Sequence, residues 1–410
     1  MVEFRTDGTG LKGLPLGLLG KYIFFACICL TFVAMGFFSY VYKPLAIAAV
    51  LGTAYFLMAW QQAGRPAIPY AVLLPFAFMV YVAIFPGWPL FPDIQIADIG
   101  LEMYLVGLGF SVFFTNRAYI PPLCLAACIC VTFIYWIFAS PPSFTFGGYR
   151  LQLLFNHPNV LGLIASWNIV HICCVWRQLP RGMRPFAAIA IVCLFSCIVL
   201  TEGRSTYLSI LLTIVGSCFI MPWKIFRKVL LAGILCWFCA YALSLSSGHA
   251  RMMPNPKQLM QEQNMQTRIV FWKAALDGFY TAPLTGLGHR TYGDYLDRYI
   301  TANAPVVEER PRHPHSMYLD ILYSWGLVGA VMLFVVFVPA MLHARRQKEY
   351  FLPLSVLLML GHGVFDSSLH MKAGLMVIFI PLGMLWGKQL QIALIASPLV
   401  RSPSQTEKTT

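Results

Sequence analysis

Two histidines flank a proline in the segment Arg310-Pro-Arg-His-Pro-His-Ser-Met-Tyr318. Histidine is the side chain best suited to move protons near neutral pH. His315 is therefore a candidate general base, and His313 and Ser316 are candidates for substrate binding. The two histidines could instead bind a metal ion, but the sequence offers no obvious third ligand.

Arginines form a second group of candidate residues. Arg204 stands in the short polar turn Thr201-Glu-Gly-Arg-Ser-Thr-Tyr207, and Arg268 begins the segment Arg268-Ile-Val-Phe-Trp272. A guanidinium is always charged and can bind phosphate oxygens through two parallel hydrogen bonds. The arginines therefore indicate an anionic ligand, although each alone could be an interfacial or surface charge, and Arg204 could pair with Glu202. Four further arginines are weaker candidates: Arg251, Arg290, Arg310 and Arg312.

Other polar residues have simpler explanations. Asp294 with Asp297, and the adjacent pair at 308–309, could hold a divalent cation, but a solvated loop surface explains them equally well. His157 is typical of a cap or turn residue at the end of a helix, with a substrate contact as the alternative. Asp366 falls within a predicted span, where an ionisable residue can mark an ion path.

The composition places these residues in a membrane protein. Apolar residues make up 59% of the 410 and charged residues 11%, and the mean hydropathy is +0.70. Average soluble domains carry roughly 25% charged residues, so we exclude a cytosolic or secreted globular enzyme, and the apolar content excludes disorder. The net charge of +13 lies in loops between apolar runs, so it does not indicate nucleic acid as a partner. The 12 cysteines lie in apolar stretches, which is typical of packing residues rather than of disulfides or zinc ligands.

The apolar runs predict an all-α polytopic membrane protein with about twelve transmembrane helices. A spanning helix needs roughly 17–25 mostly apolar residues. The candidate spans are 22–42, 44–61, 67–86, 96–115, 118–139, 158–176, 185–201, 205–223, 229–248, 316–343, 350–370 and 373–396.

The spans divide the chain into four regions. We expect an N-terminal bundle of about nine spans over 1–248, a large periplasmic loop over 249–315, three further spans over 316–396 and a disordered cytoplasmic tail over 397–410. Inside the long loop, apolar residues three to four positions apart predict a helix over 266–280. Lysine and arginine concentrate in segments that face inward if the N-terminus is cytoplasmic, which predicts that both termini are cytoplasmic.

Three motifs resemble those of the bacterial O-antigen ligase/polymerase superfamily. His315-Ser316, followed after nine residues by Gly326-Leu-Val-Gly329, fits the ligase pattern of a histidine, then Asn, Ser or Gln, and nine residues later Gly-x-x followed by Gly, Thr or Tyr. The 201–207 turn resembles the family's Ser-Arg-Gly turn, although it reads Glu-Gly-Arg-Ser. Arg268-x-x-x-Trp272 with Pro283-Leu-Thr-Gly-Leu-Gly288 resembles the family's Arg-x-x-x-Trp and Pro-x-x-Gly-x-Gly loop. Many relatives have Asn where Ser316 stands, and His313 is outside the pattern.

The resemblance implies a fold similar to that of C-type glycosyltransferases and a reaction at the periplasmic face of a Gram-negative inner membrane. Such ligases transfer a glycan from undecaprenyl diphosphate to a sugar hydroxyl of the lipid A–core oligosaccharide. His315 would act as general base, while Arg204 and Arg268, helped by Arg290 and Arg251, would stabilise the diphosphate leaving group. No metal or other cofactor is expected, and direct attack would invert the anomeric carbon. Membrane lipids are the remaining expected partners.

Three other functions stay open. A polymerase that lengthens a lipid-linked glycan and a protein O-oligosaccharyltransferase share the superfamily. The close match to the histidine motif disfavours the polymerase, and the few residues after the last predicted span disfavour the oligosaccharyltransferase. A transporter or flippase would predict paired intramembrane charges or repeated halves, and the predicted spans carry few charges, chiefly Asp366.

Overall fold

The computed structural model describes residues 68–84, 94–114, 118–139, 157–221, 263–303, 310–367 and 371–396, with scattered positions between them that include two short strands. The strands β1 (Thr145–Phe146) and β2 (Arg150–Leu151) pair in an antiparallel ladder. The helices are α3 (Tyr70–Ile84), α4 (Ile94–Phe114), α5 (Ile120–Ala139), α6 (Pro158–Val175), η3 (Trp176–Gln178), η4 (Arg181–Met183), α7 (Arg184–Thr201), α8 (Arg204–Ile220), α11 (Gln263–Thr281), η5 (His289–Thr291), α12 (Tyr292–Asn303), α13 (Met317–Arg346), α14 (Phe351–His362) and α15 (Lys372–Ala396).

The described helices confirm most of the predicted segments. α3 to α8, α13 and α15 each lie within a few residues of a predicted span, and α11 covers the helix predicted over 266–280. The span predicted over 350–370 is wrong at its end, because α14 stops at His362 and the chain then turns. Some predicted regions lie outside the described residues, namely span 229–248 and the tail 397–410. Span 22–42 and most of span 44–61 also lie outside them, apart from isolated positions.

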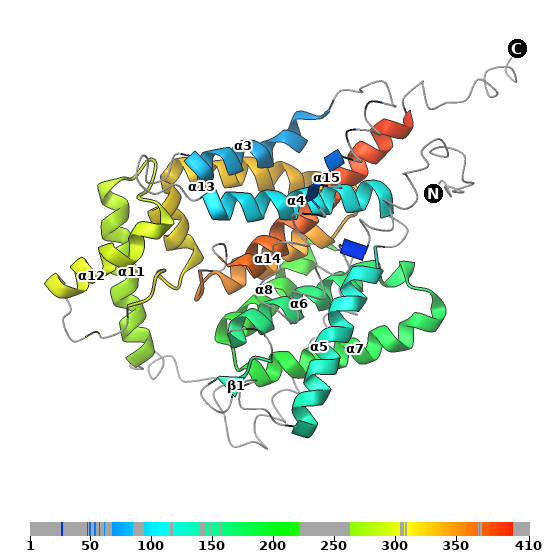
Figure 1. The fold of residues 1–410 in the computed structure, drawn as a ribbon, viewed down its shortest axis with the longest axis horizontal. Coiled ribbons are helices and arrows are strands. Elements are labelled where there is room, and N and C mark those ends of the chain that lie inside the picture. The colour runs from blue at the N-terminus through cyan, green and yellow to red at the C-terminus, as the bar shows by residue number, and fades with distance from the viewer. Residues whose placement is uncertain are drawn as a thin grey trace, which may run out of the picture.

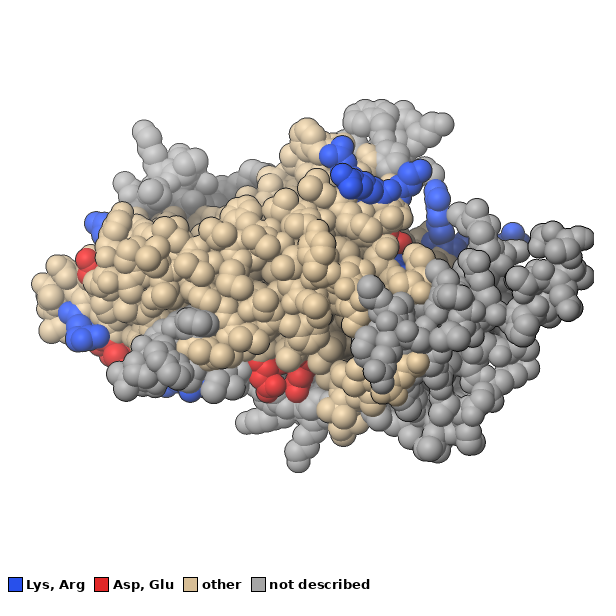
Figure 2. Space-filling view, turned by 90° about the horizontal axis from the view of Figure 1, so that it is seen from above, with Lys and Arg blue, Asp and Glu red and all other residues tan. Residues whose placement is uncertain are grey.

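Several described helices have the properties of membrane spans. α5, α6, α7, α13 and α15 are long and apolar enough to cross a membrane, while α3, α8 and α14 are apolar but shorter. Their outer faces expose large apolar side chains, including Phe138, Val192, Phe219 and Phe334. On the face drawn in Figure 2, Lys and Arg side chains lie at the left edge and at the upper right of the described surface, and a broad area of residues that carry no charge separates them. The total of twelve spans and their orientation stay predictions.

Close helix contacts depend on glycine where two backbones meet. α4 and α15 approach so closely that a Cβ at Gly107 would lie 2.3 Å from the Ile380 carbonyl oxygen. A Cβ at Gly383 would likewise lie 2.2 Å from the Tyr104 carbonyl oxygen. Small residues allow such close approach between helices in a membrane, where close packing is needed because lipid tails are as apolar as the side chains and no hydrophobic effect drives the helices together.

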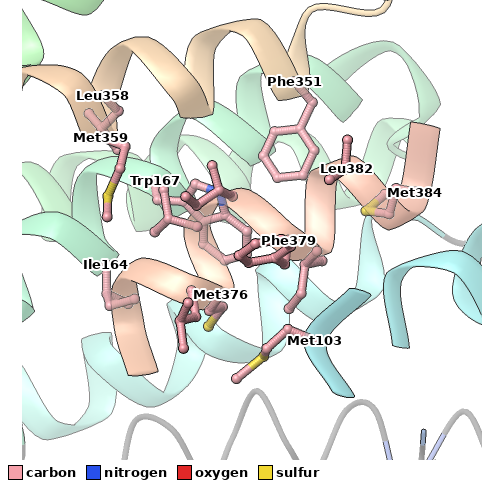
Figure 3. Packing of buried hydrophobic residues seen from close by; sticks show 14 of the residues in the cluster. Met103, Ile164, Trp167, Phe351, Leu358, Met359, Met376, Phe379, Leu382 and Met384 are labelled. Carbon is pink, nitrogen blue, oxygen red and sulfur yellow. The ribbon is translucent and has the colours of Figure 1, made fainter. Parts of the chain in front are cut away.

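Large apolar side chains fill the centre of the bundle between α4, α6, α14 and α15. Trp167, Phe379 and Met103 are almost fully buried there, and Figure 3 shows them packed with Phe351 and Met376. The indole N–H of Trp167 donates to Ser355 Oγ at 3.1 Å, so the one polar atom of this large side chain is satisfied.

The helix directions bring several termini together. α7 and α14 finish, and α6, α8 and α13 begin, at the end of the bundle where α11 and α12 lie (Figure 1). We call this the α11 end. The opposite end, where α6 finishes and α14 begins, is called the far end.

A backbone exchange fixes the region around α11 to the bundle. α13 is broken at Gly326, which has φ +62° and ψ −166°. At the break, backbone carbonyl and N–H groups of α13 lose their hydrogen bonds within the helix. The backbone of residues 283–288 packs there and supplies new hydrogen-bond partners for these groups. The four bonds are Leu287 N–H to Tyr323 O (2.8 Å), Gly288 N–H to Ser324 O (3.1 Å), Leu327 N–H to Pro283 O (2.9 Å) and Val328 N–H to Leu284 O (3.0 Å).

Gly326→Ala should lower the free energy of unfolding by about 2–5 kcal/mol, because the backbone conformation at Gly326 is nearly exclusive to glycine and a Cβ would add crowding. That Cβ would lie 2.3 Å from the Leu284 carbonyl oxygen. The thermal unfolding temperature of the purified protein in detergent measures the loss. Gly182→Ala is the matched control, because a Cβ at Gly182 meets nothing within 4 Å. Equal unfolding temperatures for the two variants would contradict the docking role of Gly326.

Candidate active site

His315 occupies a strained position directly before α13. Its φ is +53°, in the left-handed region that a non-glycine residue rarely adopts. Ser316 follows as the buried N-cap of α13, and Met317 N–H donates to the Gly363 carbonyl oxygen at 2.8 Å. Such strain costs of order 1–3 kcal/mol and persists where the surroundings hold the residue in place. The fold therefore sets the direction of the His315 ring.

Two aromatic rings pack against His315. Phe271 of α11 stacks on it with 6.0 Å between ring centroids, and His313 meets it edge to face at 4.4 Å. Burial lowers the pKa of His315 to about 3, and His313 and Arg268 act in the same direction. Near neutral pH the imidazole is thus uncharged and has a nitrogen lone pair that can accept a proton.

Arg268 crosses from α11 to the turn after α14. Its Nη1 donates to the Phe365 carbonyl oxygen at 2.5 Å, and the side chain is half-buried. The charge lies close enough to His315 to lower that residue's pKa. The structure therefore brings together two of the residues that the motifs singled out.

A buried polar network lies beside these two residues and centres on Asn159. Its Nδ2 donates to Asp366 Oδ2 at 3.0 Å, and its Oδ1 accepts from Arg150 Nη2 at 3.0 Å. The Asn159 carbonyl oxygen lies 3.2 Å from His362 Nε2. Burial would raise the pKa of Asp366, but its hydrogen bond from Asn159 and the nearby histidines hold the pKa below its ordinary value. The network thus joins a carboxylate, an amide and a guanidinium at the start of α6.

The same network positions the turn that carries Arg204. Arg150 Nε donates to the Thr201 carbonyl oxygen at 2.9 Å, at the end of α7. Glu202 then adopts a left-handed conformation with φ +48°, and α8 begins at Arg204. A Cβ at Gly203 would lie 3.2 Å from Asn159 Oδ1, so the turn packs directly on the amide. Arg204 is half-buried at this edge of the network.

His157 caps α6, which confirms the interpretation of this residue as a cap. Its Nδ1 accepts a hydrogen bond from Asn159 N–H at 3.2 Å, so a neutral His157 carries its proton on Nε2. Burial lowers the pKa of His157, and Arg150 and Arg268 add to this effect, while Asp366 opposes it. His157 also lowers the pKa of His315, and Arg268 and Asp366 act on both histidines, which places them in one electrostatic environment.

One predicted site residue within the described part of the chain is not brought to this cluster. Arg290 is exposed in η5, and among the described contacts none joins it to His315. Its neighbour His289 lies 3.4 Å from Asp320 Oδ1 on α13 instead. Arg251 lies outside the described residues. Arg310 forms a surface ion pair with Asp297 at 2.9 Å, as expected for solvated loop charges.

Sequence reasoning missed part of the cluster. Asp366 was interpreted as an intramembrane residue, whereas it lies in the turn after α14 and accepts from Asn159. His362 belongs to none of the motifs, yet its Nε2 lies 3.3 Å from Ser205 Oγ as well as near the Asn159 carbonyl oxygen. The signal for Asn159 was present in the segment that contains His157, while nothing near Arg150 marked it as more than a loop charge.

The cluster combines a neutral imidazole with guanidinium groups at the end of a helical bundle. An imidazole can take a proton from a hydroxyl, and guanidinium groups can stabilise negative charge on a leaving group. No group of three or more His, Cys, Asp or Glu side chains suited to a metal ion occurs among the described residues. The arrangement is therefore suited to acid–base chemistry next to an anion.

Part of the chain matches a known protein family. Residues 189–334 match the family described as O-antigen ligase. The matched range contains every residue that the motifs marked for the site, from Arg204 to Ser316, whereas Arg150, Asn159, His362 and Asp366 lie outside it. No curated protein matches the chain.

Proposed function

We propose that the chain, whose residues 189–334 match the family described as O-antigen ligase, transfers a glycan from undecaprenyl diphosphate to a sugar hydroxyl of the lipid A–core oligosaccharide. The acceptor hydroxyl attacks the anomeric carbon, and the bond from that carbon to the diphosphate oxygen breaks. His315 accepts the proton of the attacking hydroxyl, and the diphosphate carries away the bonding electrons. A single displacement of this kind inverts the anomeric carbon and needs no covalent enzyme intermediate.

The observation that carries this proposal is the position of His315. The residue is held at φ +53°, is neutral near pH 7, and lies beside Arg268. A general base has to be unprotonated and fixed in direction, and proton transfer of this kind is typically worth about 10²–10⁴-fold in rate. The backbone strain and the lowered pKa meet both requirements.

Arginines take the role of binding the leaving diphosphate. Arg268 and Arg204 border the same polar network, the first through Phe365 and the second through the turn on Asn159. Fixed positive groups that face a developing negative charge lower the activation barrier, a role that a metal ion serves in other enzymes. Arg290 and Arg251 would contact the diphosphate or glycan further out, and His313 and Ser316 would contact substrate beside His315.

The proposed location follows from the helices and from the lipid-linked donor. The described helices are those of a multi-pass membrane protein. We place it in the inner membrane of a Gram-negative bacterium, with the α11 end periplasmic and both termini cytoplasmic. Both substrates carry lipid anchors, so the cluster at the end of the bundle would meet their headgroups at the membrane surface.

The test is transfer by purified full-length protein in EDTA. Undecaprenyl-diphosphate glycan and rough lipopolysaccharide serve as donor and acceptor, and glycosylated lipopolysaccharide is the expected product. Lengthening of the lipid-linked glycan instead would show a polymerase, and transfer only to a protein acceptor would show an oligosaccharyltransferase. Loss of activity in EDTA that added Mg²⁺ restores would contradict a metal-independent reaction.

The pH profile gives an independent check on the base. The kcat/KM for transfer should stay level from about pH 8 down to about pH 5, because only neutral His315 accepts a proton and its pKa of about 3 lies below this range. As the pH falls through that pKa, protonation removes the base and the rate declines. Arg268→Gln removes a positive neighbour, so the residual activity should fall at a higher pH. A fall in the wild-type rate centred near pH 6.5 would contradict the lowered pKa.

A further inference from the structure

A small cavity lies at the far end of the bundle, away from the candidate active site. It lies between the end of α6, the start of α14 and the middle of α15, and it has a volume of about 50 Å³. His171 lines this cavity and stands fourteen positions after His157 along α6, so the two sites lie about 20 Å apart at 1.5 Å per residue. Most of the lining is apolar, and Phe351 and Met384 from it appear on the same side of the core in Figure 3.

His171 is a buried polar residue in this lining. The side chain is 1% exposed and stacks on Phe351 with 4.0 Å between ring centroids. Neither ring nitrogen has a hydrogen-bond partner within the part of the chain that the structure describes. A buried polar atom without a hydrogen bond costs about 1–3 kcal/mol. An occupant that hydrogen-bonds to the imidazole would remove that cost.

Two opposite charges stand beside the same cavity. Lys388 Nζ and Glu349 Oε1 form an ion pair at 2.6 Å, and both residues line the cavity while remaining partly exposed. A ligand with one positive and one negative group could contact both without leaving either charge unmatched. A purely anionic ligand would meet the Glu349 carboxylate, and a purely cationic ligand would meet the Lys388 ammonium group.

We propose that this cavity binds the headgroup of a phospholipid that carries a primary amine. The ammonium group enters the cavity and donates hydrogen bonds to His171 and Glu349, while the phosphodiester stays at the mouth against Lys388. The limited volume admits the amine end only, so the acyl chains lie outside against the apolar surface of the helices. A trimethylated amine is larger and has no N–H to donate, so it fits the site poorly.

Native mass spectrometry of the full-length protein in detergent tests this proposal. The probes are dioleoyl phosphatidylethanolamine, phosphatidylcholine and phosphatidylglycerol. The wild-type protein should retain phosphatidylethanolamine about tenfold better than the other two lipids. Equal retention of phosphatidylethanolamine and phosphatidylcholine would overturn the site, because hydrogen bonding from the amine would then contribute nothing.

Two variants separate binding from stability. His171→Phe keeps the ring on Phe351 but removes both nitrogens, so the preference for phosphatidylethanolamine should disappear. His343→Phe is the matched control, because His343 also stacks on an aromatic ring, Trp386, but does not line the cavity. A preference that survives in His171→Phe, or is lost equally in both variants, would overturn the proposal.

The mouth charges give a second test that does not depend on the buried ring. Glu349→Gln should weaken retention of phosphatidylethanolamine and strengthen that of phosphatidylglycerol, because the carboxylate that repels an anion is gone. A destabilised protein would lose both lipids together, so the reversal of preference is specific to binding. An unchanged order of the lipids in Glu349→Gln would count against the proposed headgroup orientation.

Discussion

His315→Ala should reduce glycan transfer to lipopolysaccharide by at least about 10²–10⁴-fold, the range that a positioned general base supplies. The residue is the neutral imidazole that packs against Phe271 and His313 and lies near Arg268. Without it, the attacking hydroxyl has to lose its proton to water. Because the affected step is chemical, the loss should appear mainly in kcat, and single-turnover transfer by purified protein measures it.

Backbone strain at His315 requires a second variant. Alanine at φ +53° adds a conformational cost of its own, whereas asparagine tolerates the left-handed region better. His315→Asn should therefore keep the wild-type unfolding temperature and still fail to transfer glycan. His313→Ala is the neighbouring control and should retain more activity. Normal amounts of ligated lipopolysaccharide in cells that carry His315→Ala would exclude His315 as the base.

The helices were predictable because a membrane selects strongly for long apolar runs. α5, with no charged residue between Ile120 and Ala139, coincides almost completely with its predicted span. α11 was predictable for a different reason, since its apolar residues recur at helical spacing inside a polar loop. The end of α14 was not predictable, because the apolar pattern continues past His362. In the structure, the Gly363 carbonyl oxygen accepts a hydrogen bond from Met317 N–H, 46 positions earlier in the chain.

The glycine motifs were visible in the sequence, but their purpose was not. Gly326 and residues 283–288 belong to two separate motifs, and only the structure shows that their backbones exchange hydrogen bonds. Sequence spacing describes contacts along one element, whereas this contact joins a loop to a helix that begins about thirty residues later. These glycines thus serve the packing, and His315 is the part of the motif that could serve the chemistry.

The polar network was beyond sequence reasoning for the same physical reason. Asn159, Asp366 and Arg150 come from the start of α6, the turn after α14 and β2, and each alone has an ordinary explanation as a cap or a loop charge. Helix packing at the α11 end places them within hydrogen-bond distance. A single sequence carries no information on which loop ends meet, so the sequence singles out Arg204, Arg268 and His315 but not the residues that support them.

Arg268→Lys should lower kcat/KM for transfer by about 10²-fold, although the charge is kept. Arg268 already donates one N–H to the Phe365 carbonyl oxygen. A guanidinium can do this and still present N–H groups in a fixed plane to two oxygens of a diphosphate, whereas an ammonium on a flexible stem acts as a point charge. Removing one donor that stabilises a transition-state charge typically costs about 10²–10³-fold.

Arg298→Lys is the matched control for this change, because Arg298 is exposed on α12, donates to the Asp294 carbonyl oxygen of its own helix and has no part in the proposed site. It should keep most of the wild-type kcat/KM. Steady-state transfer with both variants, at equal expression and equal unfolding temperature, separates the planar hydrogen-bonding role from charge alone. If lysine at position 268 works as well as arginine, the charge alone suffices, and Arg268 then serves attraction of the donor rather than geometric binding of its diphosphate.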